Sequence, residues 1–190
     1  MRVAIASDHA GFEQKQLLAA YLAEDLAQDV LDLGPDSDDR VDYPDFANKV
    51  AHAVANGDAE YGVLVCGTGI GMALTADKVA GIRASSITTP EFAALFREHN
   101  DGNVVCLSGR FVDLDVNKQI IKTFLATEFG GGRHQQRVDK IMANDNNLSS
   151  IYSAWFYILV RDVYGGEKRG YGRRVRYGAC DRCRPSDGAT

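Results

Sequence analysis

Residues 62–71 read Gly62-Val63-Leu64-Val65-Cys66-Gly67-Thr68-Gly69-Ile70-Gly71, and this stretch decides the fold class. Its first half is a short apolar run rich in branched residues, which is typical of a buried strand. Its second half is a glycine-rich turn that opens a helix-like segment. A buried strand that passes through a tight turn into a helix is the repeating unit of α/β proteins with a parallel sheet.

The same alternation of strand-like and helix-like segments continues through the first 130 residues. The strand-like apolar runs cover residues 3–6, 30–33, 62–66, 82–87 and 103–107. The segments that follow them have apolar residues three and four positions apart, as in amphipathic helices. This pattern predicts an α/β protein with a doubly wound, three-layer αβα sandwich, whose five-stranded parallel sheet is Rossmann-like.

Local signals set the expected faces and limits of the helices. The first helix carries Leu17, Leu18 and Leu22 on one apolar face. The fourth begins at Thr88-Thr89-Pro90-Glu91, where a hydroxyl can cap the helix and proline suits its first turn. The fifth is predicted over residues 115–129.

The composition is that of an ordinary globular protein with one main domain. The chain has 190 residues, is 45% hydrophobic and carries a net charge of −5. A negative charge argues against nucleic acid as a partner, because phosphate backbones bind basic surfaces. The longest apolar stretch, residues 151–160, is too short to span a bilayer, so we expect no membrane partner. No secretory signal opens the chain, and a reducing, cytoplasmic location is the simplest expectation.

The end of the chain differs in character from the rest. Residues 144–190 hold eight Lys or Arg and five Asp or Glu, a net charge of +3, so that residues 1–143 carry −8. We therefore expect a main domain over residues 1–142 and an atypical tail over residues 143–190, poorly ordered or forming one short helix. Cys180 and Cys183 are spaced like half of a zinc site, but no second pair lies near them, so no metal site is expected.

Ligands of a doubly wound fold bind where the strands end, near the point at which the strand order reverses. Three loops should meet there, at residues 7–11, 66–71 and 108–110. In the first of them, Asp8 either caps the following helix or orients a substrate hydroxyl. His9 could bind phosphate or shuttle a proton.

The Cys66 turn has the elements of a proton-transfer site. Its glycines allow backbone N–H groups to face a ligand, and the start of the next helix adds partial positive charge. A thiolate at Cys66 could take a proton from carbon next to a carbonyl, while the N–H groups hold the resulting enediolate. The alternative is a buried cysteine before a packing turn. Met72 breaks both the dinucleotide fingerprint, which needs glycine there, and a phosphatase loop, which needs arginine.

Two further groups of polar residues come later in the chain. His99 and Asn100 end the fourth helix, at the opposite edge of the sheet from Cys66. If they belong to the site, they reach it more easily in a neighbouring subunit, which argues for a dimer. Arg133 and Arg137 would share one face of a helix and could bind phosphate. For both groups, a solvated surface position is the alternative.

Taken together, these stretches resemble the type B ribose-5-phosphate isomerases, a family related to the galactose-6-phosphate isomerase subunits. The resemblance runs from residue 1 to about residue 142. It rests on Ser7-Asp8-His9-Ala10-Gly11, Asp42-Tyr43-Pro44, Cys66-Gly67-Thr68-Gly69-Ile70-Gly71, Gly81-Ile82-Arg83-Ala84, His99-Asn100-Asp101 and Gly131-Gly132-Arg133-His134-Gln135-Gln136-Arg137.

The resemblance implies an aldose–ketose isomerase of the pentose phosphate pathway that interconverts ribose 5-phosphate and ribulose 5-phosphate through an enediolate, without metal or organic cofactor. It makes Cys66 the base that moves the proton, with Thr68 assisting, and it assigns ring opening to His99 with Asp8. The implied substrate-binding residues are His9, Tyr43, Gly67, Gly69, Ile70, Gly71, Asn100, Arg110, Arg133 and Arg137. The family also implies a homodimer or a dimer of dimers with shared active sites.

Two other functions stay open at this point. One is the same chemistry on a six-carbon substrate, such as allose or galactose 6-phosphate, and the length of the pocket would decide it. The other is a sugar-phosphate sensor that has lost catalysis. Because Cys66 and His99 are both present, the sequence favours the pentose enzyme over either alternative.

Overall fold

A computed structural model of the protein describes residues 1–145. The predicted tail falls almost entirely outside these residues, as do Cys180 and Cys183, and the domain boundary stays a prediction. The elements in chain order are β1 (Arg2–Ser7), α1 (Phe12–Glu24), β2 (Asp29–Asp32), α2 (Tyr43–Ala55), β3 (Tyr61–Cys66), α3 (Ile70–Ala76), β4 (Ala84–Ser86), α4 (Pro90–Asn100), β5 (Val104–Ser108), α5 (Leu114–Ala126), the 3-10 turn η1 (Gly132–His134) and α6 (Gln135–Met142).

The strands form one five-stranded parallel sheet in the order β2-β1-β3-β5-β4, which confirms the predicted fold class. The chain runs outward from β1 to β2 and then returns to β3 on the other side of β1. The order therefore reverses between β1 and β3, where their loops diverge and leave room for a ligand. This is the point at which the Cys66 turn emerges.

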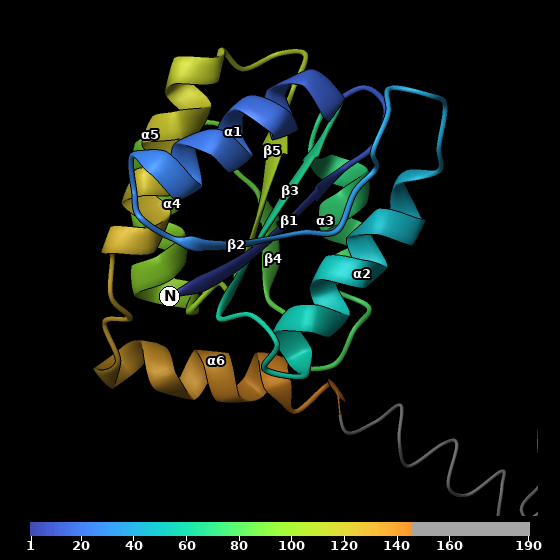
Figure 1. Cartoon of the computed structure of the whole chain (residues 1–190). Coiled ribbons are helices and arrows are strands. Elements are labelled where there is room, and N and C mark those ends of the chain that lie inside the picture. The colour runs from blue at the N-terminus through green and yellow to red at the C-terminus, as the bar shows by residue number, and fades with distance from the viewer. Residues whose placement is uncertain (146–190) are drawn as a thin grey trace, which may run out of the picture. The chain divides into compact units, whose positions relative to one another are not determined.

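Helices cover both faces of the sheet (Figure 1). Alternate side chains of each strand point to opposite faces. Ala4, Leu64 and Cys106 pack under α2 and α3, whereas Ile5 and Val105 pack under α1, α4 and α5. The sheet is thus buried on both sides, as a parallel sheet requires.

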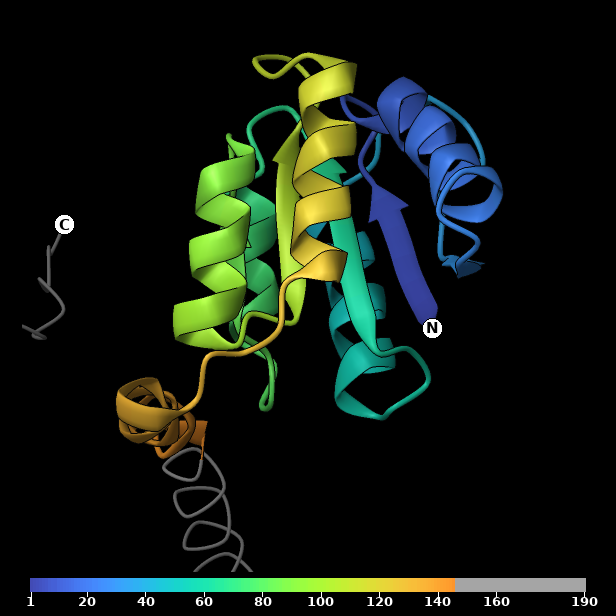
Figure 2. The same ribbon diagram turned by 90° about the vertical axis from the view of Figure 1, so that its left-hand side faces the viewer.

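The helix α6 is an addition to the five predicted strand–helix pairs. It lies beneath the edge at which the strands begin, away from both covering layers (Figures 1 and 2). The carboxyl end of α4 points to the same edge, because each helix between parallel strands runs against the strand direction. The two elements therefore meet at the amino end of the sheet.

Most of the local predictions are confirmed, and three need correction. Thr89 caps α4 by accepting a hydrogen bond from the Phe92 N–H, as expected. In α1, Leu18 and Leu22 are buried, but Leu17 is 47% exposed. The helix α5 ends at Ala126 rather than residue 129, because Thr127 has an extended backbone.

The third correction concerns the strand predicted over residues 82–87, which covers only Ala84–Ser86. The N–H of Ile82 bonds to Val79 within a turn, and the N–H of Arg83 bonds to the Asn103 side chain. Both groups are therefore lost to the sheet. Within residues 1–145, no helix has the length and apolar character needed to cross a membrane.

Candidate active site

The three loops expected to meet at the carboxyl ends of the strands do so. The Asp8 N–H donates to the Val65 carbonyl at 3.1 Å, which joins the β1 and β3 loops. The Gly109 N–H donates to the Cys66 carbonyl at 2.8 Å, and the Ser108 hydroxyl donates to the Gly67 carbonyl at 2.8 Å. The β5 loop is thereby attached directly to the Cys66 turn.

Cys66 ends β3 with its side chain almost fully buried. Its Sγ accepts a hydrogen bond from the Gly69 N–H, with a separation of 3.1 Å. The contact ties the sulfur to the backbone of the glycine turn. Gly69 has φ +79°, and a Cβ there would lie 2.7 Å from Ser86 Oγ. The position therefore needs glycine, both for its conformation and for space.

A second described cysteine, Cys106, lies on β5 and is fully buried. Burial raises the pKa of its thiol well above the usual value, and the nearby charges of Cys66 and Asp77 raise it further. Cys106 therefore stays protonated at neutral pH and cannot serve as a base. The structure thus distinguishes the two cysteines, although each follows a similar apolar run in the sequence.

The rest of the turn faces outward. Thr68 is exposed, and its Oγ1 accepts from the Ile70 N–H at 3.3 Å. A Cβ on Gly71 would lie 2.8 Å from the Tyr43 ring, so this ring lies directly against the turn. A Cβ on Gly67 would lie 3.5 Å from Cδ of Arg110. Two of the predicted substrate-binding side chains thus flank the glycines.

Asp8 and His9 complete the group on this edge of the sheet. The Oδ1 atom of Asp8 accepts from the N–H groups of Ala10 and Gly11, both at 2.9 Å. Asp8 therefore holds the turn that leads into α1, close to the capping role considered above. The Nδ1 atom of His9 lies 3.3 Å from the Val41 carbonyl oxygen. A cavity of about 510 Å³ opens beside His9.

The remaining predicted residues lie at the opposite edge of the sheet. His99 and Asn100 end α4, and Arg133 and Arg137 belong to η1 and α6. The six residues of β3 separate this edge from Cys66, a distance of roughly 20 Å at about 3.3 Å per residue. Within one chain, the structure does not bring the two groups together.

The two arginines do not share one helix, contrary to the prediction. Arg133 lies in the 3-10 turn, and α6 begins only at Gln135. Gly131 and Gly132 have φ of +58° and +53°. The chain therefore enters the region through a 3-10 turn, which is tighter than the first turn of an α-helix. Both arginines are nevertheless exposed at this edge.

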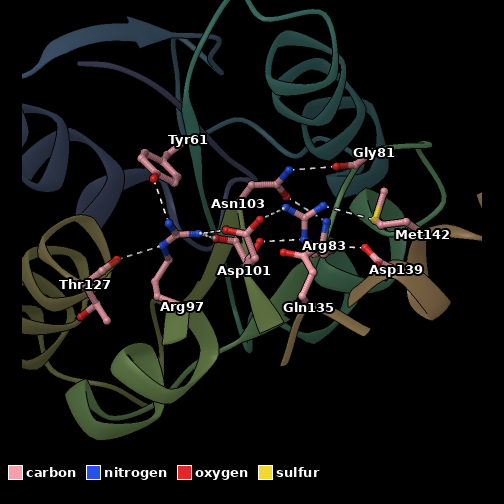
Figure 3. A network of polar contacts seen from close by, with 11 residues as sticks. Tyr61, Gly81, Arg83, Arg97, Asp101, Asn103, Thr127, Gln135, Asp139 and Met142 are labelled. Carbon is pink, nitrogen blue, oxygen red and sulfur yellow. Dashed lines mark hydrogen bonds and ion pairs between the residues drawn. The ribbon is translucent and has the colours of Figure 1, made fainter. Parts of the chain in front are cut away.

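A polar network fixes the end of α4 just beyond His99 and Asn100 (Figure 3). Asp101 has φ +48° and bridges two arginines, with Oδ2 2.9 Å from Arg83 Nη2 and Oδ1 3.0 Å from Arg97 Nη1. Arg97 also donates to the Tyr61 hydroxyl and to the Thr127 carbonyl. Sequence reasoning assigned no role to these residues, although Arg97 and Asp101 have the i, i+4 spacing of a helical ion pair.

His134 is another residue whose role sequence reasoning missed. Its ring stacks on that of His99, with centroids 4.3 Å apart and planes 7° apart. Burial lowers the pKa of His134, and the neighbouring His99, Arg133 and Arg137 lower it further. In the sequence, only the position of His134 within a basic motif could have indicated that this residue matters.

Known proteins are similar to this chain in sequence and in structure. The sequence profile of the ribose/galactose isomerases matches residues 3–141. The chain is similar to ribose-5-phosphate isomerase B of Escherichia coli, with 44% identity over 142 residues that cover 75% of this chain and 95% of that protein.

Solved structures extend the similarity to three dimensions. Ribose-5-phosphate isomerase B of Clostridium thermocellum has a TM-score of 0.76 and 42% identity, over 78% of this chain and 99% of that one. The Mycoplasma genitalium enzyme, solved with bound ribulose-5-phosphate, has a TM-score of 0.72 and 44% identity, over 76% of this chain and 96% of that one. The profile match covers most of the chain, and the chain therefore belongs to the ribose/galactose isomerase family.

Proposed function

We propose that the protein interconverts D-ribose 5-phosphate and D-ribulose 5-phosphate. The observation that carries this proposal is the hydrogen bond from the Gly69 N–H to Cys66 Sγ, inside a glycine turn at the point where the strand order reverses. It places the Cys66 sulfur next to backbone donors. The relatives from Escherichia coli and Mycoplasma genitalium, a ribose-5-phosphate isomerase B and a structure with ribulose-5-phosphate, support the choice of substrate.

In the proposed reaction, the Cys66 thiolate takes the proton from C2 of the open-chain aldose. The electron pair forms a C1–C2 double bond, and the carbonyl oxygen O1 becomes the enediolate oxygen held by the backbone N–H groups of the turn. The same thiol then returns its proton to C1. The proton on O2 moves to O1 with the help of the Thr68 hydroxyl, which leaves the ketone at C2.

Ring opening precedes this step, because ribose 5-phosphate in solution is mainly a furanose. We assign it to His99 and Asp8. His99 gives a proton to the ring oxygen O4 as the C1–O4 bond breaks, and the Asp8 carboxylate takes the proton from O1. The phosphate is held by His9 and by the guanidinium groups of Arg133 and Arg137, while Asn100 and Arg110 line the sugar site.

A complete site requires two chains, since roughly 20 Å of strand separates Cys66 from His99. In a homodimer, a two-fold axis can bring the α4 end of each subunit to the Cys66 turn of the other and form two equivalent sites. Exposed apolar side chains near both groups support such an interface: Ile70 and Leu74 on α3, and Phe92 and Leu95 on α4. A dimer of such dimers is compatible with the same contacts.

The activity belongs to residues 1–142, since the family match ends at residue 141. We place the enzyme in the cytoplasm, where a reducing environment keeps Cys66 as a free thiol. Isomerisation of allose or galactose 6-phosphate is the second candidate, supported by the breadth of the matching family, whose description includes galactose isomerases.

The test measures ketose formation from ribose 5-phosphate by the full-length protein and by Cys66→Ala. Loss of an essential base should lower kcat by roughly 10²-fold or more, with an unchanged circular dichroism spectrum. An inactive wild-type protein, or a fully active variant, would refute the proposal. Allose 6-phosphate and galactose 6-phosphate, assayed side by side, decide the substrate by the ratio of kcat/KM values.

A further inference from the structure

His134 lies next to His99, the residue proposed to open the sugar ring, although the proposed reaction gives His134 no role. Its side chain is only 7% exposed, whereas the side chain of His99 is 36% exposed. The two rings are nearly parallel and in contact, although they come from different elements, α4 and η1. His99 is thus covered on one face by His134, and its Nε2 lies 3.8 Å from a Glu98 carboxylate oxygen.

The backbone around His134 holds this arrangement in place. The Gly130 N–H donates to the Glu98 carbonyl at 2.9 Å, which attaches the loop before η1 to the last turn of α4. The His134 N–H donates to the Gly131 carbonyl at 2.9 Å and closes the 3-10 turn. The stacked pair is therefore set by two backbone contacts in addition to its own ring contact.

Burial lowers the pKa of His134, and the neighbouring charges lower it further. Its Nε2 lies 3.4 Å from Arg133 Nε, which can donate to it, and its Nδ1 is buried without a hydrogen-bond partner among the described residues. Around it are His99 and Glu98 from α4, Arg133 from η1 and Arg137 from α6. Three of these four groups oppose a positive charge on His134, and burial opposes it as well.

We propose that His134 is a positioning residue for ring opening, which holds the His99 imidazole in a fixed plane against its own ring. This inference rests on the proposed function, because it takes His99 as the group that protonates O4. His134 does not touch the substrate in this role. It supplies a flat surface against which the His99 ring stacks.

A substrate that needs no ring opening isolates this role. Ribose 5-phosphate closes its ring through O4, so the analogue that lacks the 4-hydroxyl group stays an open-chain aldehyde. Both compounds carry the same phosphate and undergo the same proton transfer at C1 and C2. A defect in ring opening should therefore lower turnover of ribose 5-phosphate and spare the analogue, whose reaction is followed by NMR.

We expect His134→Ala to lower kcat for ribose 5-phosphate by roughly 10-fold to 10²-fold, the scale of a misplaced catalytic group. The analogue should lose less than about 2-fold, since its reaction bypasses the step. His134→Phe retains a flat ring without nitrogens and should recover most of the lost activity. His52→Ala, which removes an exposed histidine on α2, should change neither reaction.

Equal losses on the two substrates would overturn the proposal, because His134 would then act on phosphate binding, proton transfer or folding. A Phe variant as impaired as the Ala variant would also overturn it, since the nitrogens rather than the stacked surface would matter. A wild-type protein inactive on ribose 5-phosphate is a different result, which refutes the proposed function itself.

Discussion

Replacing Gly69 with alanine tests whether the Cys66 turn works through its backbone. Gly69 occupies the left-handed region at φ +79°, and an added Cβ would lie 2.7 Å from Ser86 Oγ and 3.1 Å from the Cys106 carbonyl oxygen. The Ser86 hydroxyl can move, but the Cys106 carbonyl is part of β5 and cannot. The turn must therefore shift, and the N–H that donates to Cys66 Sγ shifts with it.

The expected magnitudes follow from two separate effects. An alanine in the left-handed region costs about 1–2 kcal/mol through its own conformation. The steric contacts add roughly 1–3 kcal/mol, as for other overpacked buried sites. Activity should fall by roughly 10²-fold if the oriented N–H donor is lost.

Gly57→Ala is the matched control. Gly57 also has positive φ, +81°, but its added Cβ would meet nothing within 4 Å. This variant should show only the conformational cost, a fall in Tm of roughly 2–4 °C per kcal/mol for a chain of this size, with kcat unchanged. Gly69→Ala should show a larger fall in Tm together with the loss of kcat.

The assay pairs thermal unfolding with steady-state kinetics on ribose 5-phosphate. Adding Ser86→Ala to Gly69→Ala removes the closer of the two contacts and should restore part of the stability. If Gly69→Ala keeps full activity, the N–H to sulfur contact has no part in catalysis. If Gly57→Ala loses as much stability as Gly69→Ala, the steric argument is wrong.

Three further predictions follow from the exposed and buried side chains. Phe92→Glu places a charge on the proposed interface, so analytical ultracentrifugation should show monomers and kinetic assays should show little activity. Leu17→Glu, on α1, should remain dimeric, and similar behaviour of the two variants would contradict the interface. Arg97→Met removes a buried guanidinium and should lower the free energy of unfolding by about 2 kcal/mol. Urea denaturation measures this, and an unchanged midpoint would show that the polar network does not stabilise the fold. Because the pKa of Cys106 is raised, its thiol should stay protonated through pH 8 and resist iodoacetamide in the folded protein, while Cys66 reacts. Peptide mass mapping measures both labelling rates, and labelling of Cys106 as fast as Cys66 would contradict the prediction.

Several features of the site could be predicted because they depend on neighbours in the chain. The strand before Cys66 and the turn after it follow from a run of apolar residues and closely spaced glycines. The cap at Thr89 follows from a hydroxyl and a proline at adjacent positions. Even the separation of His99 from Cys66 could be anticipated, since a helix between parallel strands must end at the opposite edge of the sheet.

The errors occur where a local pattern does not specify which contacts an element makes or which conformation its backbone adopts. Leu17 has helical spacing with Leu18 and Leu22, but no element covers its part of α1 in the described chain, so it remains exposed. The helix through Arg133 was expected from spacing, whereas two glycines with positive φ form a 3-10 turn instead. In both cases the spacing of the residues contained no information about these features.

The sequence by itself determined the parallel α/β fold and the position of a cysteine in a glycine turn, because both are set by residues adjacent in the chain. Only the tertiary structure decided which residues distant in the chain come into contact. Tyr43 lies against Gly71, Asp101 forms an ion pair with Arg83, and His134 stacks on His99. Each of these pairs joins segments far apart in sequence, and their contact is fixed by how the helices pack on the sheet rather than by any local preference.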